Sequence, residues 1–252
     1  MKLFFIDKYS VLSFLFAAAL SAVLFSGGEN VQSVGSSFDG RVPIYSVERS
    51  DSALSVTFDT AWGAEDIDAV LSALKAADCR ATFFVTGEFT DKFPEAVKKI
   101  HSAGHEVANH SNSHEHFNSL SKQEMCDSIL ECDKKIRKIT GQDEVLFRAP
   151  YGEYNKTLLN VCEETERFII QWSKDSLDYK NLSASEIGKR IMPNLKTGDI
   201  ILFHTGTENT AALLPGILSE IKAAGFSFLP CGELILKDNY YIDYTGRQFS
   251  KN

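Results

Sequence analysis

The sequence is poor in cysteine and has no excess of positive charge. Its five cysteines are odd in number and irregularly spaced, which excludes a disulfide framework, and we expect them to be small, mostly buried apolar residues. Lys and Arg number 26 against 34 Asp and Glu, for a formal net charge of −8. Nucleic acid and anionic lipid are therefore not expected partners, whereas a neutral glycan is compatible with this charge. No internal repeat is visible, and 44% hydrophobic residues suffice for a globular core.

The first 28 residues have the layout of a targeting segment. No charged residue lies between Tyr9 and Gly28, the apolar centre runs over Val11–Phe25, and Lys2 and Lys8 precede it. A basic start, an apolar middle and small residues at the end are typical of a secretory signal peptide. Twenty uncharged residues in a helix also span ~30 Å, about one bilayer core. The pattern predicts a signal peptide or a membrane anchor, and an extracytoplasmic protein that is membrane-anchored or secreted.

The remaining chain divides by composition into three parts. Residues 29–50 are rich in Ser, Gly and Asn and are interpreted as a linker and lead-in. A globular domain is expected over 51–237, followed by a C-terminal tail over 238–252.

Apolar strands and amphipathic helices alternate through the globular part. The capping boxes Ser121/Glu124 and Ser183/Glu186 predict two helix starts. Strands separated by helices predict an α/β fold with a parallel sheet, either closed as a (β/α) barrel or open and doubly wound. The spacing does not choose between the two. Seven strands are predicted, at residues 54–58, 81–85, 105–110, 145–148, 168–172, 200–204 and 226–229.

Polar residues that could take part in catalysis or metal binding gather where these strands end. In parallel α/β folds the carboxyl ends of the strands meet on one face, which carries the active site. The predicted set therefore converges there. Its members are Asp59, His110, His114, Arg148, Asp175, Asp178 and His204.

Each of these residues also has a plainer interpretation. His110 and His114, in H-S-N-S-H, can present two imidazoles to one metal if the segment turns helically, or they can belong to a polar loop. Asp59 is a candidate general base on an activated water, or a helix cap. Arg148 can hold that carboxylate or form a structural ion pair.

Two further residues form a candidate acid. His204 follows a very apolar strand and can donate a proton to a leaving amine, or it can be a hydrogen-bonded core histidine. Asp178 can orient His204 and raise its pKa, or it can be a turn residue.

Five short motifs over residues 50–237 resemble the polysaccharide deacetylases of the NodB-homology group, carbohydrate esterase family four. They occur in the family's order and are together highly specific. They are T-F-D-T at 57–60, H-S-N-S-H at 110–114, R-A-P-Y-G at 148–152, W-S-K-D-S-L-D-Y at 172–179 and L-F-H at 202–204.

The resemblance implies a distorted (β/α) barrel of about seven parallel strands and assigns roles to the motif residues. Asp59 would be the catalytic base, positioned by Arg148, and His204 the general acid, supported by Asp178. His110 and His114 would bind a divalent metal that activates a water. The groove would be lined by Pro150, Tyr151 and Trp172, with the backbone N–H of Tyr151 helping to bind the oxyanion.

Two positions depart from the family pattern. Most members have a second Asp that completes the metal site, and this chain has Thr60 there, a weak third-ligand position. We therefore expect the metal, taken as zinc, to be weakly held. Tyr179 stands where Trp is usual, which should only reshape the groove wall. The stretch T-F-D-T-A-W-G resembles the sporulation-associated branch of spore-forming Gram-positive bacteria and implies peptidoglycan as the substrate.

These observations predict hydrolytic N-deacetylation of an amino-sugar polymer, with no obligate protein partner. One alternative is an inactive wall-glycan-binding relative, and the intact motif residues argue against it. The other is a metal-independent amide hydrolase on the same fold, against which the export segment argues.

Overall fold

The computed structural model describes residues 40–207 and 209–251. The predicted targeting segment and the first half of the predicted linker and lead-in, residues 29–39, lie outside this range. Within it, no helix combines the length and apolarity needed to cross a membrane.

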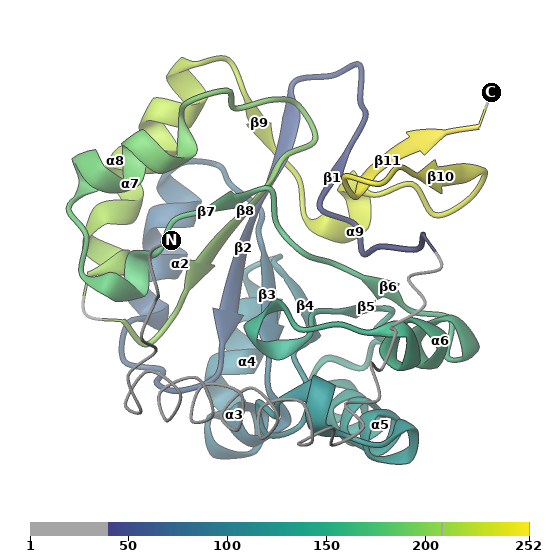
Figure 1. The fold of residues 1–252 in the computed structure, drawn as a ribbon. Helices are drawn as coiled ribbons and strands as arrows, with labels where there is room; N and C mark the ends of the chain where they lie inside the picture. The colour runs from purple at the N-terminus through teal and green to yellow at the C-terminus, as the bar shows by residue number, and fades with distance from the viewer. Residues whose placement is uncertain (1–39, 208, 252) are drawn as a thin grey trace, which may run out of the picture. The chain divides into compact units, whose positions relative to one another are not determined.

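The described chain is built on one parallel sheet that curls into a partial barrel (Figure 1). Every ladder of this sheet is parallel. The prediction of about seven parallel strands in a distorted barrel is therefore confirmed. In spatial order the strands are β6 (Phe168–Ile169), β5 (Leu146–Phe147), β4 (Glu106–Asn109), β3 (Thr82–Val85), β2 (Ala53–Thr60), β8 (Ile200–His204) and β7 (Lys174–Asp175), with β9 (Ser227–Phe228) beside the start of β2.

The predicted fifth strand, 168–172, pairs as a strand only over its first two residues. Phe168–Ile169 pairs with β5, and Lys174–Asp175 then pairs with β8 at the opposite end of the sheet. Between them Ile170 bridges to Ile44, and the amide of Ser173 donates to the carbonyl of Ile200 over 2.9 Å. Residues 170–173 thus connect the edge strand β6 to the edge strand β7. The described sheet therefore has two short strands where one strand over 168–172 was predicted.

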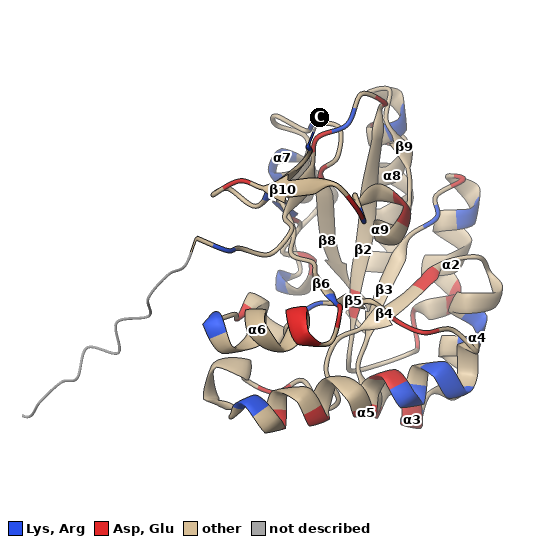
Figure 2. Cartoon of the chain, turned by 90° about the vertical axis from the view of Figure 1, so that its right-hand side faces the viewer, with Lys and Arg blue, Asp and Glu red and all other residues tan. Residues whose placement is uncertain are grey.

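Helices cover the outer face of the sheet. Figure 1 shows α2, α7 and α8 on one flank and α3 to α6 around the other. They are α2 (Ile67–Ala76), α3 (Gly87–Lys92), α4 (Pro94–Ser102), α5 (Lys122–Thr140), α6 (Lys156–Glu164), α7 (Ala184–Ile191) and α8 (Thr210–Ala223). The short α9 (Cys231–Leu234) packs instead against inner-face residues such as Phe84 and Ala108. Charged residues of both signs are interspersed along these helices (Figure 2).

Local signals in the sequence set several helix ends. Ser121 and Ser183 each form the complete predicted capping box, with Glu124 and Glu186. Gly141 ends α5 in the left-handed conformation, with φ 74°.

All eight residues of β2 are buried, because both of its faces are covered. Leu54, Val56 and Phe58 pack into the core beneath the helices. The alternate positions, which the sequence marks as the polar side, face the barrel interior, where Thr57 donates a hydrogen bond to the carbonyl of Ile201 over 2.8 Å. The polar alternation therefore marks an internal site and not a solvent-exposed face.

A small second sheet lies beyond the amino ends of β2 and β8. It joins β1 (Ser46–Val47), from the predicted lead-in, to β11 (Arg247–Ser250) and β10 (Tyr240–Ile242), from the predicted tail. The amide of Val47 donates to the carbonyl of Gly198, whose φ of +77° and contact with Val47 leave no room for a Cβ. The segments at 41–50 and 238–251 are thus packed parts of the structure.

Candidate active site

The polar side chains predicted to converge do so at the carboxyl ends of β2, β4, β5 and β8. Asp59 and His204 are direct partners in the β2–β8 ladder. The amide of His110 bonds to β3 through the carbonyl of Val85, and that of Arg148 bonds to β4 through the carbonyl of Asn109. Parallel register therefore sets these residues side by side.

Arg148 is the largest fully buried side chain of the described residues, and it holds Asp59. Its Nη1 donates to Asp59 Oδ1 over 2.7 Å and to Thr57 Oγ1 over 3.0 Å. The Nε and Nη2 groups donate to the carbonyls of Ile170 and Gln171. The guanidinium also lies 4.0 Å from the ring centroid of Phe84. A charge removed from water this completely needs such a full set of partners, and the result is a fixed cation beside the carboxylate.

His110 is oriented by the backbone of the neighbouring strand. Its Nδ1 lies 2.8 Å from the carbonyl oxygen of Arg148. A carbonyl can only accept, so Nδ1 carries the proton and Nε2 keeps its lone pair. Among the described residues Nε2 has no hydrogen-bond partner, and it lies 3.5 Å from Asp59 Oδ2. Burial lowers the pKa of His110, which keeps the ring neutral. An oriented, neutral imidazole with an unused buried lone pair is the form that binds metal.

His114 reaches His110 through an irregular loop and not through the helical turn that the spacing suggested. Ser111 and His114 both have left-handed backbones, with φ of 71° and 57°. The two imidazole centroids are 5.0 Å apart. Burial, followed by the electrostatic interaction with the neighbouring His110, lowers the pKa of His114 to about 4, so the ring of His114 is also neutral and keeps a lone pair at neutral pH.

A network behind this loop holds its shape. The Glu115 carboxylate accepts from the amide and hydroxyl of Ser113 and from the hydroxyl of Ser128 on α5. The Ser128 hydroxyl in turn accepts from the amide of Asn112 over 2.9 Å. These bonds offset the backbone strain of the left-handed residues. Sequence reasoning did not single out Glu115 or Ser128, since neither lies in a motif.

The residues fit a divalent cation only partly. The two imidazoles are suitable ligands, but in the described range no three His, Cys, Asp or Glu side chains are grouped to hold a metal. The hydroxyl of Thr60 is buried without a hydrogen-bond partner there. For such a cation the described residues offer two neutral nitrogen donors and, at position 60, no carboxylate.

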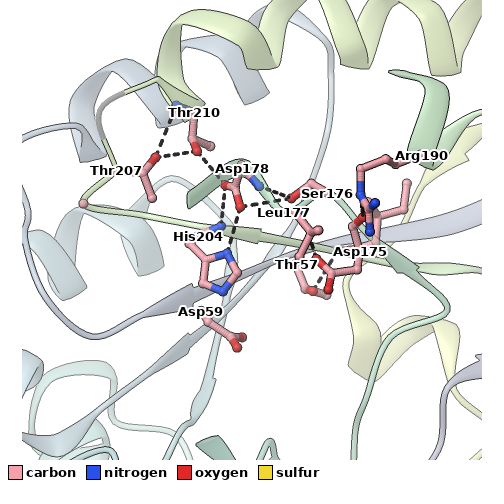
Figure 3. A network of polar contacts seen from close by, with 12 residues as sticks. Thr57, Asp59, Asp175, Ser176, Leu177, Asp178, Arg190, His204, Thr207 and Thr210 are labelled. Atoms are coloured by element: carbon pink, nitrogen blue, oxygen red, sulfur yellow. Dashed lines mark hydrogen bonds and ion pairs between the residues drawn. The ribbon is translucent and has the colours of Figure 1, made fainter. Parts of the chain in front are cut away.

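Asp178 forms hydrogen bonds with His204 on the side opposite to Asp59 (Figure 3). Asp178 Oδ1 lies 2.8 Å from His204 Nδ1, and Oδ2 accepts the amide of His204 over 2.8 Å. The hydroxyls of Ser176 and Thr210 also donate to this carboxylate. Both oxygens are thereby occupied, and the ring leaves its Nε2 turned toward the site.

The surroundings of Asp59 and of His204 shift the pKa values of these two groups in opposite directions. Burial by itself raises the pKa of Asp59, but the electrostatic interactions with His110, Arg148 and His204 and the hydrogen bond from Arg148 outweigh it and lower that pKa below its usual value. Burial by itself lowers the pKa of His204, but the hydrogen bond that its ring donates to Asp178 and the charges of Asp59 and Asp178 outweigh it and raise that pKa. These opposite shifts favour the carboxylate form of Asp59 and the protonated form of His204, the arrangement that acid–base catalysis requires.

The other predicted residues lie at different depths. Tyr151 is 58% exposed, in a left-handed turn with φ 59°, and Pro150 beside it is buried. Trp172 is partly buried beneath this turn, 5.5 Å from the Arg148 guanidinium. Asp175 does not bond His204. It caps a turn by accepting the amide of Leu177 over 2.9 Å.

The chain resembles known proteins along most of its length. The Polysaccharide deacetylase family pattern matches residues 46–167. The peptidoglycan-N-acetylglucosamine deacetylase PgdA of Listeria monocytogenes is 34% identical over 215 residues, which are 84% of this chain. The chain spans only 46% of that relative's own length.

The fold of the chain is also similar to that of solved structures. A CE4 family pseudoenzyme from Bacillus anthracis superposes with a TM-score of 0.74 at 28% identity, covering 78% of this chain and 69% of that one. A family 4 carbohydrate esterase from Streptomyces lividans, in complex with acetate, superposes with a TM-score of 0.66 at 32% identity, covering 70% of this chain and 91% of that one. By sequence, by fold and by its motifs, the chain belongs to the polysaccharide deacetylase family, carbohydrate esterase family 4.

Proposed function

We propose that this chain hydrolyses N-acetyl groups of an amino-sugar polymer, with peptidoglycan as the substrate. The observation that carries the proposal is the direct pairing of Asp59 with His204 across β2 and β8, each held by its own counter-charge. A water attacking an amide must lose a proton, and the departing amine must gain one. A carboxylate and a protonated imidazole side by side perform these two transfers.

In the proposed reaction Asp59 accepts the proton of the attacking water. Arg148 keeps Asp59 in place and ionised until that transfer. His204 donates its proton to the amide nitrogen as the bond between carbon and nitrogen breaks, which leaves acetate and a free amine. Asp178 stabilises the positive charge of the His204 imidazolium before this step. It also keeps the His204 ring in the same orientation throughout the reaction.

We further propose that His110 and His114 hold a divalent cation, with zinc the first to test. A bound divalent cation would polarise the acetyl carbonyl and lower the pKa of water. The support is the buried, unpartnered Nε2 of His110 and its fixed tautomer. With Thr60 in place of a carboxylate, the binding is proposed to be weak.

The location is part of the same proposal. Peptidoglycan lies outside the cytoplasmic membrane, and the uncharged run from Tyr9 to Gly28 is suited to export or anchoring. We propose an extracytoplasmic, secreted or membrane-anchored protein of the sporulation-associated branch.

A glycan-binding protein without activity is the second candidate, because a pseudoenzyme is among the similar structures. The test is incubation of peptidoglycan fragments with the parent chain and with Asp59→Asn, followed by mass spectrometry and acetate measurement. The variant keeps the shape of the side chain but not its basicity. We expect the parent to remove acetyl groups and the variant to be at least ~10²-fold slower, since general base catalysis typically contributes 10²–10⁴-fold. Binding of fragments without acetate release by the parent would establish the second candidate instead.

A further inference from the structure

Exposed aromatic side chains gather around the candidate active site. Five aromatic residues in the described range are largely exposed, namely Trp62, Tyr151, Tyr179, Tyr241 and Tyr244. Three of these contact the ring of a site histidine. Trp62 and Tyr151 lie 5.0 and 4.7 Å from His114, and Tyr179 lies 5.0 Å from His204, all between ring centroids.

Trp62 stands apart because the acid–base chemistry makes no use of it. It follows β2 by two residues, and its indole lies against His114 with a 55° tilt between the rings. It is nevertheless 55% exposed. A side chain that served only to cover His114 would bury most of its own surface. The exposed surface of the Trp62 indole is therefore a candidate ligand-binding surface.

The loop that carries Trp62 is anchored to the loop after His204. The Asp66 carboxylate accepts the amide of Gly206 over 2.9 and 3.0 Å. Gly206 has a φ of +69° and lies so close to the backbone of Gly63 that a Cβ would not fit. The indole is therefore presented from a fixed backbone, which lowers the entropy lost when a ligand packs on it.

The exposed face suits a pyranose ring. One face of such a sugar is a flat array of C–H groups and its rim is polar, so it matches an aromatic residue with one side on protein and the other in water. The formal net charge of −8 favours a neutral ligand over an anionic one.

We propose that Trp62 is a sugar-stacking platform that binds the residue adjoining the one that loses its acetyl group. This rests on the proposed function and adds to it a determinant of polymer specificity. Trp62 contacts the predicted metal ligand His114 and not the proton-transferring pair, so its ligand is a neighbouring sugar. The platform makes the chain prefer oligosaccharides over single acetylated sugars.

The test compares N-acetylglucosamine oligomers of one to five residues. For the parent, kcat/KM should rise with length. Trp62→Ala should lose about 10-fold on the pentamer, mainly through KM, and much less on the monomer, in line with about 1.4 kcal/mol per factor of ten. Trp62→Phe keeps a ring and should retain most of the preference. Tyr244→Ala, an 87% exposed aromatic, is the matched control and should behave as the parent. Equal losses on all lengths for Trp62→Ala would overturn the platform.

A binding measurement separates this inference from the proposed function. Trp62 and Trp172 are the only tryptophans. In the Asp59→Asn background, titration with the pentamer should change the tryptophan fluorescence, and Trp62→Phe should remove most of that change. Weaker pentamer binding in Trp62→Ala, in a parent that releases no acetate, would refute the proposed function and keep the platform. Unchanged binding in Trp62→Ala, or no binding by the parent, refutes the platform.

Discussion

At the scale of single residues, the site depends on paired side chains whose charges fix one another. Asp59 is held by Arg148, and His204 by Asp178. Each partner is buried and makes further hydrogen bonds, which prevents it from swinging away. The carboxylate of Asp178 is the clearest case, because its neighbours Ser176 and Thr210 occupy the lone pairs that His204 leaves free.

Replacing Asp178 by Asn should change the pH dependence of the reaction. Asp178 raises the pKa of His204, and a general acid works only while protonated. In Asp178→Asn that pKa falls, so the alkaline limb of the kcat/KM profile moves to lower pH. The rate at neutral pH drops by at most the ~10²–10⁴-fold that general acid catalysis contributes.

The matched control is Asp175→Asn, which removes a more distant charge and leaves the bond between Asp178 and His204 intact. Asp175→Asn should move the alkaline limb of the kcat/KM profile to lower pH, but by less than Asp178→Asn does. An alkaline limb that stays in place in Asp178→Asn would show that His204 is not the acid.

A second prediction concerns the weak metal position. Thr60→Asp should tighten zinc binding, because a carboxylate attracts a divalent cation far more strongly than a hydroxyl does. Loss of a supporting ligand typically costs ~10–100-fold in metal affinity, so a gain of that order is expected. Calorimetric titration with Zn²⁺ measures it, after chelator treatment of both forms.

Activity is not the readout for this variant, since a carboxylate next to Asp59 also alters the pKa of the base. His114→Ala should abolish the gain in Thr60→Asp. Zinc binding by the parent as tight as in Thr60→Asp would mean that another residue already serves as the third ligand.

At the scale of elements, the site residues sit at strand ends, and the loops between them are shaped by side chains from helices. The loop at 110–114 is held by Glu115 and by Ser128 of α5. The small sheet β1–β11–β10 is tied to the rest of the described chain in a similar way. Gln248 is fully buried, and its amide pairs with both the N–H and the carbonyl of Leu236 at 2.7 Å.

Gln248→Ala should destabilise the fold. It removes the partners of both backbone groups of Leu236 in a partly buried position, where an unsatisfied group costs about 1 kcal/mol, at the low end of the ~1–3 kcal/mol for a fully buried one. Denaturant unfolding measures the change. Gln123→Ala is the control, because Gln123 is exposed on α5 and bonds only Asp127, so the change should stay within about 0.5 kcal/mol. Equal effects of the two substitutions would mean that the small sheet does not contribute to stability.

At the scale of the whole molecule, the sheet order brings the two ends of the described chain to one side and the proposed catalytic residues to the other. The Ser46–Asp199 bridge lies at the start of β8, while His204 ends it. The small sheet therefore does not cover the face with the site.

The location of the protein can be tested on intact cells. If residues 1–28 export or anchor the chain, protease added to protoplasts should digest the globular part, while a cytoplasmic marker stays intact. The uncharged apolar run behind Lys2 and Lys8 motivates this expectation. Digestion only after lysis would place the chain in the cytoplasm and favour the alternative of a metal-independent amide hydrolase.

Short-range physics allowed the sequence to determine much of this protein. The capping boxes at Ser121 and Ser183, the glycine stop at 141 and the polar–apolar alternation of β2 depend on residues within a few positions of each other. The convergence of Asp59, His110, Arg148 and His204 follows from a parallel sheet once their strand ends are known.

Tertiary structure decided what depends on distant partners. Arg148 bonds Thr57 and Asp59 from 91 and 89 positions away, and no local pattern marks Thr57 for that role. The left-handed loop that brings His114 to His110 needs Ser128 of α5, and the contact of Trp62 with His114 needs the anchored Gly206. The strand predicted at 168–172 ends early because Ile44, from the predicted lead-in, bridges to Ile170. Each of these is fixed by packing and hydrogen bonding between segments far apart in the chain, which sequence periodicity does not record.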